Sequence, residues 1–143
     1  MGAKHQLKLF LREAYARVLF HTGLCALVDR IAPRRLSILA DHCVTADSNA
    51  TLAKDMRIEG AKLERILRNL GRRHELTTVN EGWRSLHSPG RRSLVALSMD
   101  DGYKDNRTHL LPLLQRVGAP ATVYLETAAL DERALNWSHL FFW

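Results

Sequence analysis

One stretch of the chain, residues 93–103, constrains the fold more than any other and reads SLVALSMDDGY. An apolar run leads directly into Asp100, Asp101 and Gly102, and a pattern of helical spacing begins at Tyr103. These features predict a buried strand, a sharp turn and a helix, with two carboxylates at the carboxyl end of the strand. Active sites of parallel α/β sheets lie at that end of the strands. The two acids are therefore the first candidates for a functional site.

Alternating helix and strand patterns continue after this stretch. Apolar residues at helical spacing between residues 110 and 117 predict a helix that ends near Gly118, with Pro112 inside it only as a kink or a restart. Residues 121–125 form another β-prone run. This alternation predicts an α/β fold in which parallel strands are joined by right-handed crossovers.

The length of the chain limits how complete this fold can be. Thr127 can cap a last short helix over residues 128–135, and the chain then ends in an aromatic run. Three or four candidate strands are too few to close a barrel, which takes about 250 residues. We expect residues 36–143 to be the truncated N-terminal part of a larger domain.

A second polar pair comes after another predicted strand. Residues 36–40 form a short apolar run that predicts a buried strand, and Asp41 and His42 come directly after it. A polar pair at the carboxyl end of a strand can belong to a site, so His42 is a candidate for a place beside the two acids. The alternative is a histidine with a structural role.

The middle of the chain carries a second helical pattern. Residues 53–74 have apolar side chains at helical spacing with arginines between them, and Gly71 marks the expected end of the helix. Residues 76–79 are β-prone. Asn80 is the expected cap of a short helix over residues 81–86.

The first 35 residues are predicted to form an N-terminal amphipathic helix. Helical spacing extends from residue 6 to residue 31, with Gly23 as a candidate interruption and Pro33 as the stop. The face opposite the apolar stripe is basic and contains Lys8, Arg12, Arg17 and Arg30. We favour a helix packed on the domain with a solvated basic face; a helix that contacts a membrane surface is the alternative.

Composition sets outer limits on the protein's class. The chain has 143 residues, 46% of them apolar, and a net charge of +6, which fits one soluble globular domain. This charge can attract anions, but it also serves solubility alone, and we favour the latter. Cys25 and Cys43 form no C-x-x-C pair, so we expect free thiols. We recognise no signal peptide and expect a cytoplasmic protein, membrane-peripheral if the first helix binds lipid.

The adjacent acids Asp100 and Asp101 have a structural interpretation and a catalytic one. Asp-Gly is a common turn dipeptide, so the pair can simply form a turn. The pair also ends a buried strand and opens a helix, whose amides favour negative charge. Strand alternation would point the two carboxylates in different directions. One could then bind a divalent metal while the other holds or deprotonates a metal-bound water.

Residues 97–103 resemble the first motif of the polysaccharide deacetylases (carbohydrate esterase family four), which usually reads Thr-Phe-Asp-Asp-Gly. The flanks are similar too: Asp105-Asn106, the Leu-Pro-Leu-Leu run at 111–114 and the Gly-Ala-Pro-Ala-Thr-Val run at 118–123 match the helix and strand that come after that motif in the family. Residues 38–44 resemble an apolar-Tyr-His-x-Val stretch of the family, with aspartate in place of tyrosine. Residues 66–86 are more loosely similar.

The resemblance implies a (β/α) barrel that removes acetyl groups from N-acetylated sugars of a polysaccharide or oligosaccharide. It implies that Asp100 is the catalytic base and Asp101 a ligand of a divalent metal, usually zinc, with His42 and Tyr103 beside the site. The family's later histidine motif, which supplies two more metal ligands, is absent from this chain. Because catalytic zinc normally has three protein ligands, we expect residues 1–143 alone to be inactive.

Two interpretations from other classes stay open. Residues 51–70 can be written as a helix-turn-helix whose second helix, residues 62–70, is arginine-rich. Arg57 stands where such a turn usually has glycine, and this interpretation leaves residues 94–125 without a role, so we expect no nucleic-acid partner. The other alternative is a noncatalytic domain that associates with membranes through the first helix.

Overall fold

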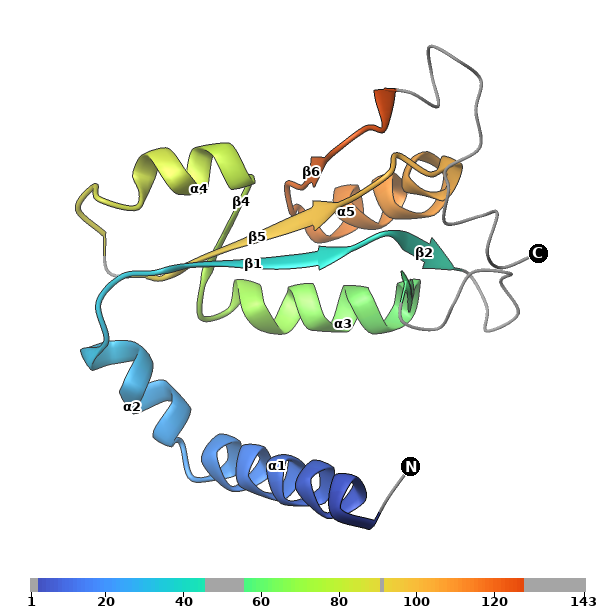
Figure 1. The fold of residues 1–143 in the computed structure, drawn as a ribbon. Coiled ribbons are helices and arrows are strands. Elements are labelled where there is room, and N and C mark those ends of the chain that lie inside the picture. Colours follow the sequence, from blue (N-terminus) through green and yellow to red (C-terminus); the bar gives the residue numbers. More distant parts are fainter. Residues whose placement is uncertain (1–2, 46–55, 91, 128–143) are drawn as a thin grey trace. The chain divides into compact units, whose positions relative to one another are not determined.

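The chain divides into two compact units, Met1–Pro33 and Arg34–Trp143. The computed structural model describes residues 3–45, 56–90 and 92–127 (Figure 1). The first unit contains two helices, α1 (Ala3–His21) and α2 (Leu24–Ile31). The second unit contains, in chain order, β1 (Leu36–Asp41), β2 (Cys43–Thr45), β3 (Arg57–Glu59), α3 (Gly60–Gly71), β4 (Glu75–Thr77), α4 (Val79–Ser85), β5 (Leu94–Met99), the π-helical segment η2 (Asn106–Leu110), α5 (Leu111–Val117) and β6 (Thr122–Val123).

Gly23 interrupts the helix of the first unit, so the predicted interruption is confirmed and residues 6–31 form two helices in place of one. Its φ of 75° lies in the left-handed region, which glycine adopts without a steric penalty. Its carbonyl then accepts hydrogen bonds from the N–H groups of Ala26 (3.0 Å) and Leu27 (3.1 Å) and starts α2. None of the described helices is long and apolar enough to cross a membrane.

β5 is the central strand of the second unit. β1 pairs with its whole length on one side, from Leu36 opposite Leu94 to Asp41 opposite Met99. On the other side β4 pairs with the first half of β5 and β6 with the second half. All of these pairings are parallel, and every residue of β5 is buried. The predicted buried strand before the two acids is thus confirmed.

β1 forms where residues 36–40 predict a strand, but it is not buried. Among the described strands it lies at the edge of the sheet and pairs with β5 alone. Ile38, in its middle, is 52% exposed. An apolar run predicts a strand from local spacing, whereas the exposure of that strand depends on its position in the sheet.

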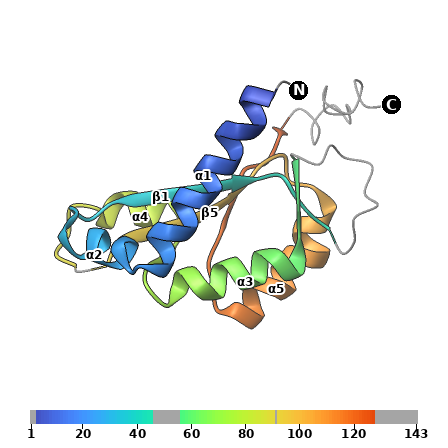
Figure 2. The same cartoon turned by 90° about the horizontal axis from the view of Figure 1, so that it is seen from below.

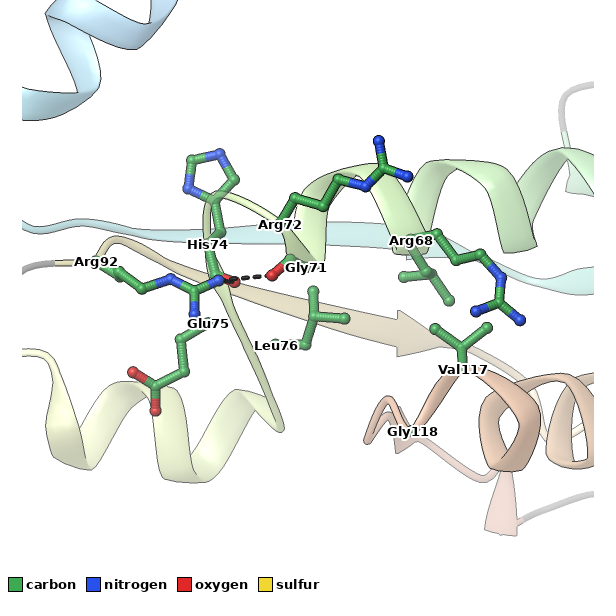
Figure 3. A pocket seen from close by; sticks show the side chains of 10 residues that line it. Arg68, Gly71, Arg72, His74, Glu75, Leu76, Arg92, Val117 and Gly118 are labelled. Atoms are coloured by element: carbon green, nitrogen blue, oxygen red, sulfur yellow. Dashed lines mark hydrogen bonds between the residues drawn. The ribbon is translucent and has the colours of Figure 1, made fainter.

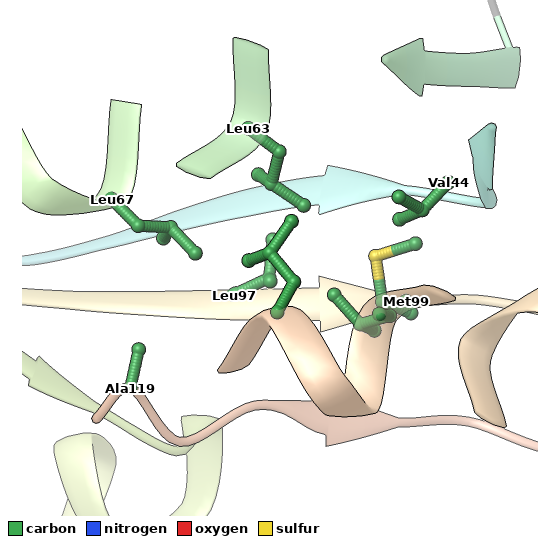
Figure 4. Packing of buried hydrophobic residues seen from close by; sticks show 8 residues of the cluster. Val44, Leu63, Leu67, Leu97, Met99 and Ala119 are labelled. Atoms are coloured by element: carbon green, nitrogen blue, oxygen red, sulfur yellow. The ribbon is translucent and has the colours of Figure 1, made fainter. Parts of the chain in front are cut away.

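Two helices cover one face of the sheet and enclose the core. α3 and α5 lie side by side on that face (Figure 2). Leucines of these helices pack against Leu97 and Met99, which point to the same face of β5. The buried cluster (Figure 4) consists of Val44, Leu63, Leu67, Leu97, Met99, Leu110, Leu113 and Ala119. Glu64 of α3 links the two helices at the surface, since it accepts hydrogen bonds from Arg68 (2.8 Å) and Arg116 (3.2 Å), which lower its pKa.

α4 approaches the sheet through a glycine. A Cβ on Gly82 would lie 2.8 Å from Leu36 Cδ1 and 2.9 Å from Thr77 Cγ2, so any larger residue would force these side chains to shift. The helix is capped by Thr78, whose Oγ1 accepts a hydrogen bond from the N–H of Glu81 (3.2 Å). The prediction of Asn80 as the cap is therefore wrong by two positions. The Thr78 hydroxyl also donates to Glu81 Oε2 (2.9 Å), so the same two residues are joined by a second hydrogen bond at the start of the helix.

The helix predicted over residues 53–74 begins later than expected. Residues 57–59 form strand β3, which pairs in parallel with β2, and α3 starts only at Gly60. The predicted end at Gly71 is confirmed. A strand thus occupies the position that a helix-turn-helix needs for its turn; the proposed first helix of that motif falls mostly on residues 46–55, outside the described residues.

The helix after the acidic turn contains a change of pitch. The π-helical segment η2 precedes α5, and Pro112 lies in the first turn of α5. Proline lacks an N–H and is tolerated at the start of a helix, so the expected restart is what the structure shows. α5 ends at Gly118, whose φ of 68° is left-handed. The helix predicted over residues 128–135 lies outside the described residues.

The observed class is α/β with a parallel sheet, as predicted. Four of the described strands form an open sheet in the order β1-β5-β4, with β6 beside the second half of β5, and β2 and β3 form a separate two-stranded sheet. A closed barrel is not shown by this part of the chain.

Candidate active site at the carboxyl end of the central strand

A tight turn presents Asp100 and Asp101 at the end of β5. The N–H of Gly102 donates to the Asp100 carbonyl (2.9 Å), and Asp101 and Gly102 both have left-handed φ angles, 67° and 68°. Asp101 is the single described non-glycine residue with a positive φ. Aspartate tolerates this region better than most residues, yet such backbone strain gathers at functional sites. Asp101 is not part of a strand, so the turn, and not strand alternation, sets the direction of its side chain.

The backbone of Asp100 is fixed by the neighbouring strand. Its N–H donates to the Asp41 carbonyl (3.0 Å), and the N–H of Tyr124 donates to the Met99 carbonyl (2.8 Å) just before it. Both carboxylates are half-buried. Within the described part of the chain neither has a hydrogen-bond or ion-pair partner. The fold therefore holds the backbone of Asp100 and leaves the carboxylate oxygens of both acids available.

The two other sequence candidates lie at the same end of the sheet. His42 comes directly after β1, whose last residue, Asp41, is opposite Met99. Its backbone N–H donates to Asp41 Oδ1 (2.8 Å), so that carboxylate oxygen already has a local partner. Tyr103 comes directly after the turn, is half-buried, and accepts a hydrogen bond from the N–H of Asn106 (2.9 Å) at its carbonyl. The site roles of His42 and Tyr103 stay predictions.

A third acid, Asp105, has a structural partner that spacing alone did not reveal. Its Oδ2 accepts a hydrogen bond from the N–H of Val44 (2.6 Å), 61 residues away, and so ties β2 to the segment after the acidic turn. The neighbouring Cys43 thiol is buried. Burial, first, and the charge of Asp105, second, raise the pKa of Cys43 to about 12. Cys43 is a free thiol, as expected, and it is protonated at neutral pH.

Asn106 is the polar residue of this region that sequence reasoning missed. Its side chain is 8% exposed, and neither of its amide atoms has a hydrogen-bond partner in the described part of the chain. It belongs to the apolar stripe that Leu110, Leu113 and Val117 continue at helical spacing. The sequence signal for Asn106 was a polar residue at a helical position whose neighbours along the stripe are apolar and face the core. A buried amide without partners costs about 1–3 kcal/mol.

The donor set at this end of the sheet is incomplete for a zinc ion. Asp100 and Asp101 offer free carboxylate oxygens, which divalent metals accept. The described residues contain no group of three His, Cys, Asp or Glu side chains placed to hold a metal. These residues therefore fit part of a metal site and not a whole one.

A pocket of about 470 Å³ lies at the opposite, amino end of the strands, between α3 and the turn after α5 (Figure 3). Leu76 and Val117 line its floor, and Arg68, Arg72 and Arg92 its basic rim. The Arg92 guanidinium donates to the carbonyl of Gly71 (2.6 Å) and to that of His74, and Arg68 is paired with Glu64 (2.8 Å). Two of the three arginines therefore already satisfy groups of the fold.

Solved structures with the same arrangement of elements are deacetylases. The structure matches a de-N-acetylase from Aggregatibacter actinomycetemcomitans at a TM-score of 0.56 and 22% identity, over 68% of this chain and 39% of that one. It matches a Streptococcus pyogenes deacetylase in complex with acetate at 0.58 and 19% identity, over 78% and 53%. It matches a polysaccharide deacetylase from Bacillus cereus at 0.53 and 21% identity, over 68% and 31%.

The chain matches part of the fold of the polysaccharide deacetylases. It spans about a third to a half of the length of these three structures. Neither a protein-family model nor a curated protein matches the sequence. The similarity of residues 97–103 and their flanks to the deacetylase motif is thus supported by an independent similarity of the backbone.

Proposed function

We propose that Arg34–Trp143 supplies the acidic part of a metal-dependent active site that removes acetyl groups from N-acetylated sugars of a polysaccharide or oligosaccharide. One observation carries the proposal. Two half-buried carboxylates without partners in the described structure lie on a turn of left-handed residues at the carboxyl end of a buried parallel strand. A left-handed Asp-Gly pair also suits an ordinary turn, so the support comes from the second, unpaired carboxylate and from its place at the end of the buried strand. The deacetylase fold makes acetyl transfer to water the reaction that best suits the pair.

The two acids take different parts in the proposed site. Asp101 is the metal ligand and Asp100 the general base, and His42 and Tyr103 flank them. When bound, a divalent ion such as zinc supplies Lewis acidity to the acetamide carbonyl and to a water. Asp100 is suited to accept a proton because its backbone is held by the Asp41 carbonyl while its carboxylate is unpaired in the described structure.

The proposed metal site needs ligands beyond those that the described residues supply. The described residues lack a third ligand, and the described strands leave the sheet open. A complete site in a closed barrel would need strands and ligands that these residues do not supply. We therefore expect residues 1–143 alone to have no deacetylase turnover.

A direct assay tests this expectation. Purified chain, supplied with zinc and a chitooligosaccharide, should release no acetate above the level of zinc alone. Turnover that disappears in Asp101→Ala would contradict the incompleteness of the site while supporting the role of Asp101.

A chimaera tests the roles of the acids. Residues 36–127 would replace the structurally matched segment of the Streptococcus pyogenes deacetylase, and acetate release would be measured after circular dichroism shows a folded protein. Asp100→Asn in the chimaera should lower kcat at least about 100-fold, the usual contribution of a general base. Asp101→Asn should lower zinc affinity, and Glu59→Gln, an exposed acid on β3, should change neither. A folded, active chimaera that is indifferent to both aspartates would refute the proposal.

A further inference from the structure

The first unit exposes an unusual amount of apolar side chain. Large apolar residues of both helices are exposed: Leu7, Phe10, Leu11, Tyr15, Val18, Phe20, Leu24, Leu27, Val28 and Ile31. Ile31 alone is 74% exposed. Single exposed apolar residues are ordinary, but a contiguous group of them marks an interaction surface.

These residues are ordered along the helices. Leu24, Leu27, Val28 and Ile31 have the i, i+3, i+4, i+7 spacing that places them on one side of α2. Leu7, Leu11 and Val18 share one side of α1 by the same geometry. Each helix therefore presents an apolar stripe that the other helix of this unit leaves exposed, and the stripe is more pronounced in α2 than in α1, where Phe20 lies on another side.

Basic side chains flank the stripe of α1. At 100° per residue, Lys8 and Arg17 fall on opposite borders of the stripe that Leu7, Leu11 and Val18 form, and both are exposed. Arg17 has only a long ion pair to Glu13, at 3.7 Å and fully at the surface. An apolar stripe bordered by cations is the pattern of helices that lie in the interface of a membrane.

The charge of the unit selects among the occupants that an apolar stripe can have. Its charged residues are Lys4, Lys8, Arg12, Arg17 and Arg30 against Glu13 and Asp29, a net charge of +3. Two copies of such a unit would repel each other, which disfavours self-association through this face. Nucleic acid would match the cations but not the apolar stripe. An anionic lipid surface matches both.

We propose that Met1–Pro33 binds the surface of an anionic lipid bilayer, with the apolar stripes of α1 and α2 entering the boundary between headgroups and acyl chains. The unit lies on the membrane and does not cross it, because Lys8, Arg12, Glu13 and Arg17 interrupt α1. Gly23 lets α1 and α2 adopt separate directions, so both stripes can follow one flat surface. This contact is independent of whether the second unit acts on a sugar.

Vesicle flotation of the full chain tests the proposal. The chain should float with vesicles of phosphatidylcholine and phosphatidylglycerol at 3:1, and about tenfold less with phosphatidylcholine alone, since each cation near an anionic surface contributes severalfold. The double variant Leu27→Asp, Val28→Asp should bind at least about tenfold less, because two charges would have to enter the apolar boundary. Leu111→Asp, at an equally exposed apolar position of the second unit, is the matched control and should bind as the unmodified chain does.

A second variant separates lost binding from lost folding. Lys8→Glu leaves both stripes intact and should reduce flotation with the anionic vesicles while leaving the weak binding to phosphatidylcholine unchanged. Absence of flotation with anionic vesicles would overturn the proposal, as would equal binding by the double variant. Dimers in sedimentation velocity that the double variant abolishes would also overturn it, because they would assign the apolar face to a second copy of the chain.

Discussion

The two ends of β5 use their charges in opposite ways. At the amino end, arginines satisfy the backbone: Arg34 donates to the carbonyls of Ser85 (2.7 Å), Ser88 (2.8 Å) and Arg92 (3.0 Å), and the side chain of Arg92 in turn binds the carbonyls at the end of α3. At the carboxyl end, hydrogen bonds hold the backbone of Asp100, and the side chains of Asp100 and Asp101 bind nothing in the described structure.

The difference separates structural charge from charge that is available for chemistry. Most donors of the Arg34 guanidinium are taken by three carbonyls, and Arg92, which lines the basic pocket, likewise donates to carbonyls of the fold. A pair of carboxylates held on a strained turn without partners serves no evident need of the fold. Both regions are clusters of charge in the sequence. Only their hydrogen bonds show in which region the charged side chains are already bound within the protein.

The largest expected effect is at the amino end. Arg34→Ala removes the hydrogen-bond donors of three backbone carbonyls. The Arg34 side chain that supplies them is only 13% exposed. The free energy of unfolding, measured by urea titration, should fall by about 2–4 kcal/mol. Arg72→Ala, at the exposed residue directly after α3, should change it by less than about 0.5 kcal/mol. Equal losses in the two variants would remove the structural role assigned to Arg34.

The alkaline stability of the protein tests the environment near Asp105. The pKa of Cys43 is raised from 9.0 to about 12 in the folded protein, so at high pH the unfolded chain loses this proton first. Stability from this group is therefore complete below pH 9 and decreases as the pH rises toward 12, by at most about 1.4 kcal/mol per pH unit. The measurement is the difference in unfolding free energy between the protein and Cys43→Ala across this range. A difference that is constant with pH would show that Cys43 is not held in a desolvated site.

The strain in the acidic turn is testable by two substitutions of opposite sign. Gly102→Ala places a Cβ at a left-handed φ and against the side chain of Leu125, and should lower stability by about 1–2 kcal/mol. Asp101→Gly relieves the left-handed aspartate and should raise stability by about 0.5–1 kcal/mol. Thermal unfolding measures both. If Asp101→Gly is destabilising, the aspartate makes a stabilising contact that the described structure lacks.

The smallest stability effects should come from the candidate catalytic acids themselves. Asp100→Asn and Asp101→Asn should each change the unfolding free energy by less than about 0.5 kcal/mol, because neither carboxylate has a partner to lose in the described structure. Asp105→Ala is the comparison within the same region. It removes the acceptor of the Val44 N–H and should lower stability by about 1.5–3 kcal/mol. A large loss in Asp100→Asn would make that acid structural.

Much of the candidate site could be predicted because its signals are local. The apolar run of β5, the acid pair, the glycine after it and the left-handed end of α5 at Gly118 each depend on residues within one turn or strand. β3 could not be predicted, because the helical spacing of its residues continues into α3 and only pairing with β2 makes it a strand. The cap of α4 moved from Asn80 to Thr78 for a similar reason, since β4 ends at Thr77 and leaves Thr78 at the boundary.

The amino-acid sequence determined the buried strand and the two acids at its end, since apolar spacing and turn chemistry act over a few residues. The tertiary structure decided which acids are free. Asp105 and Asp100 are both carboxylates of one loop, but Asp105 meets the N–H of Val44, 61 positions earlier in the chain, while Asp100 meets no partner in the described residues. A hydrogen bond across that distance depends on how the strands align, and no local pattern encodes it.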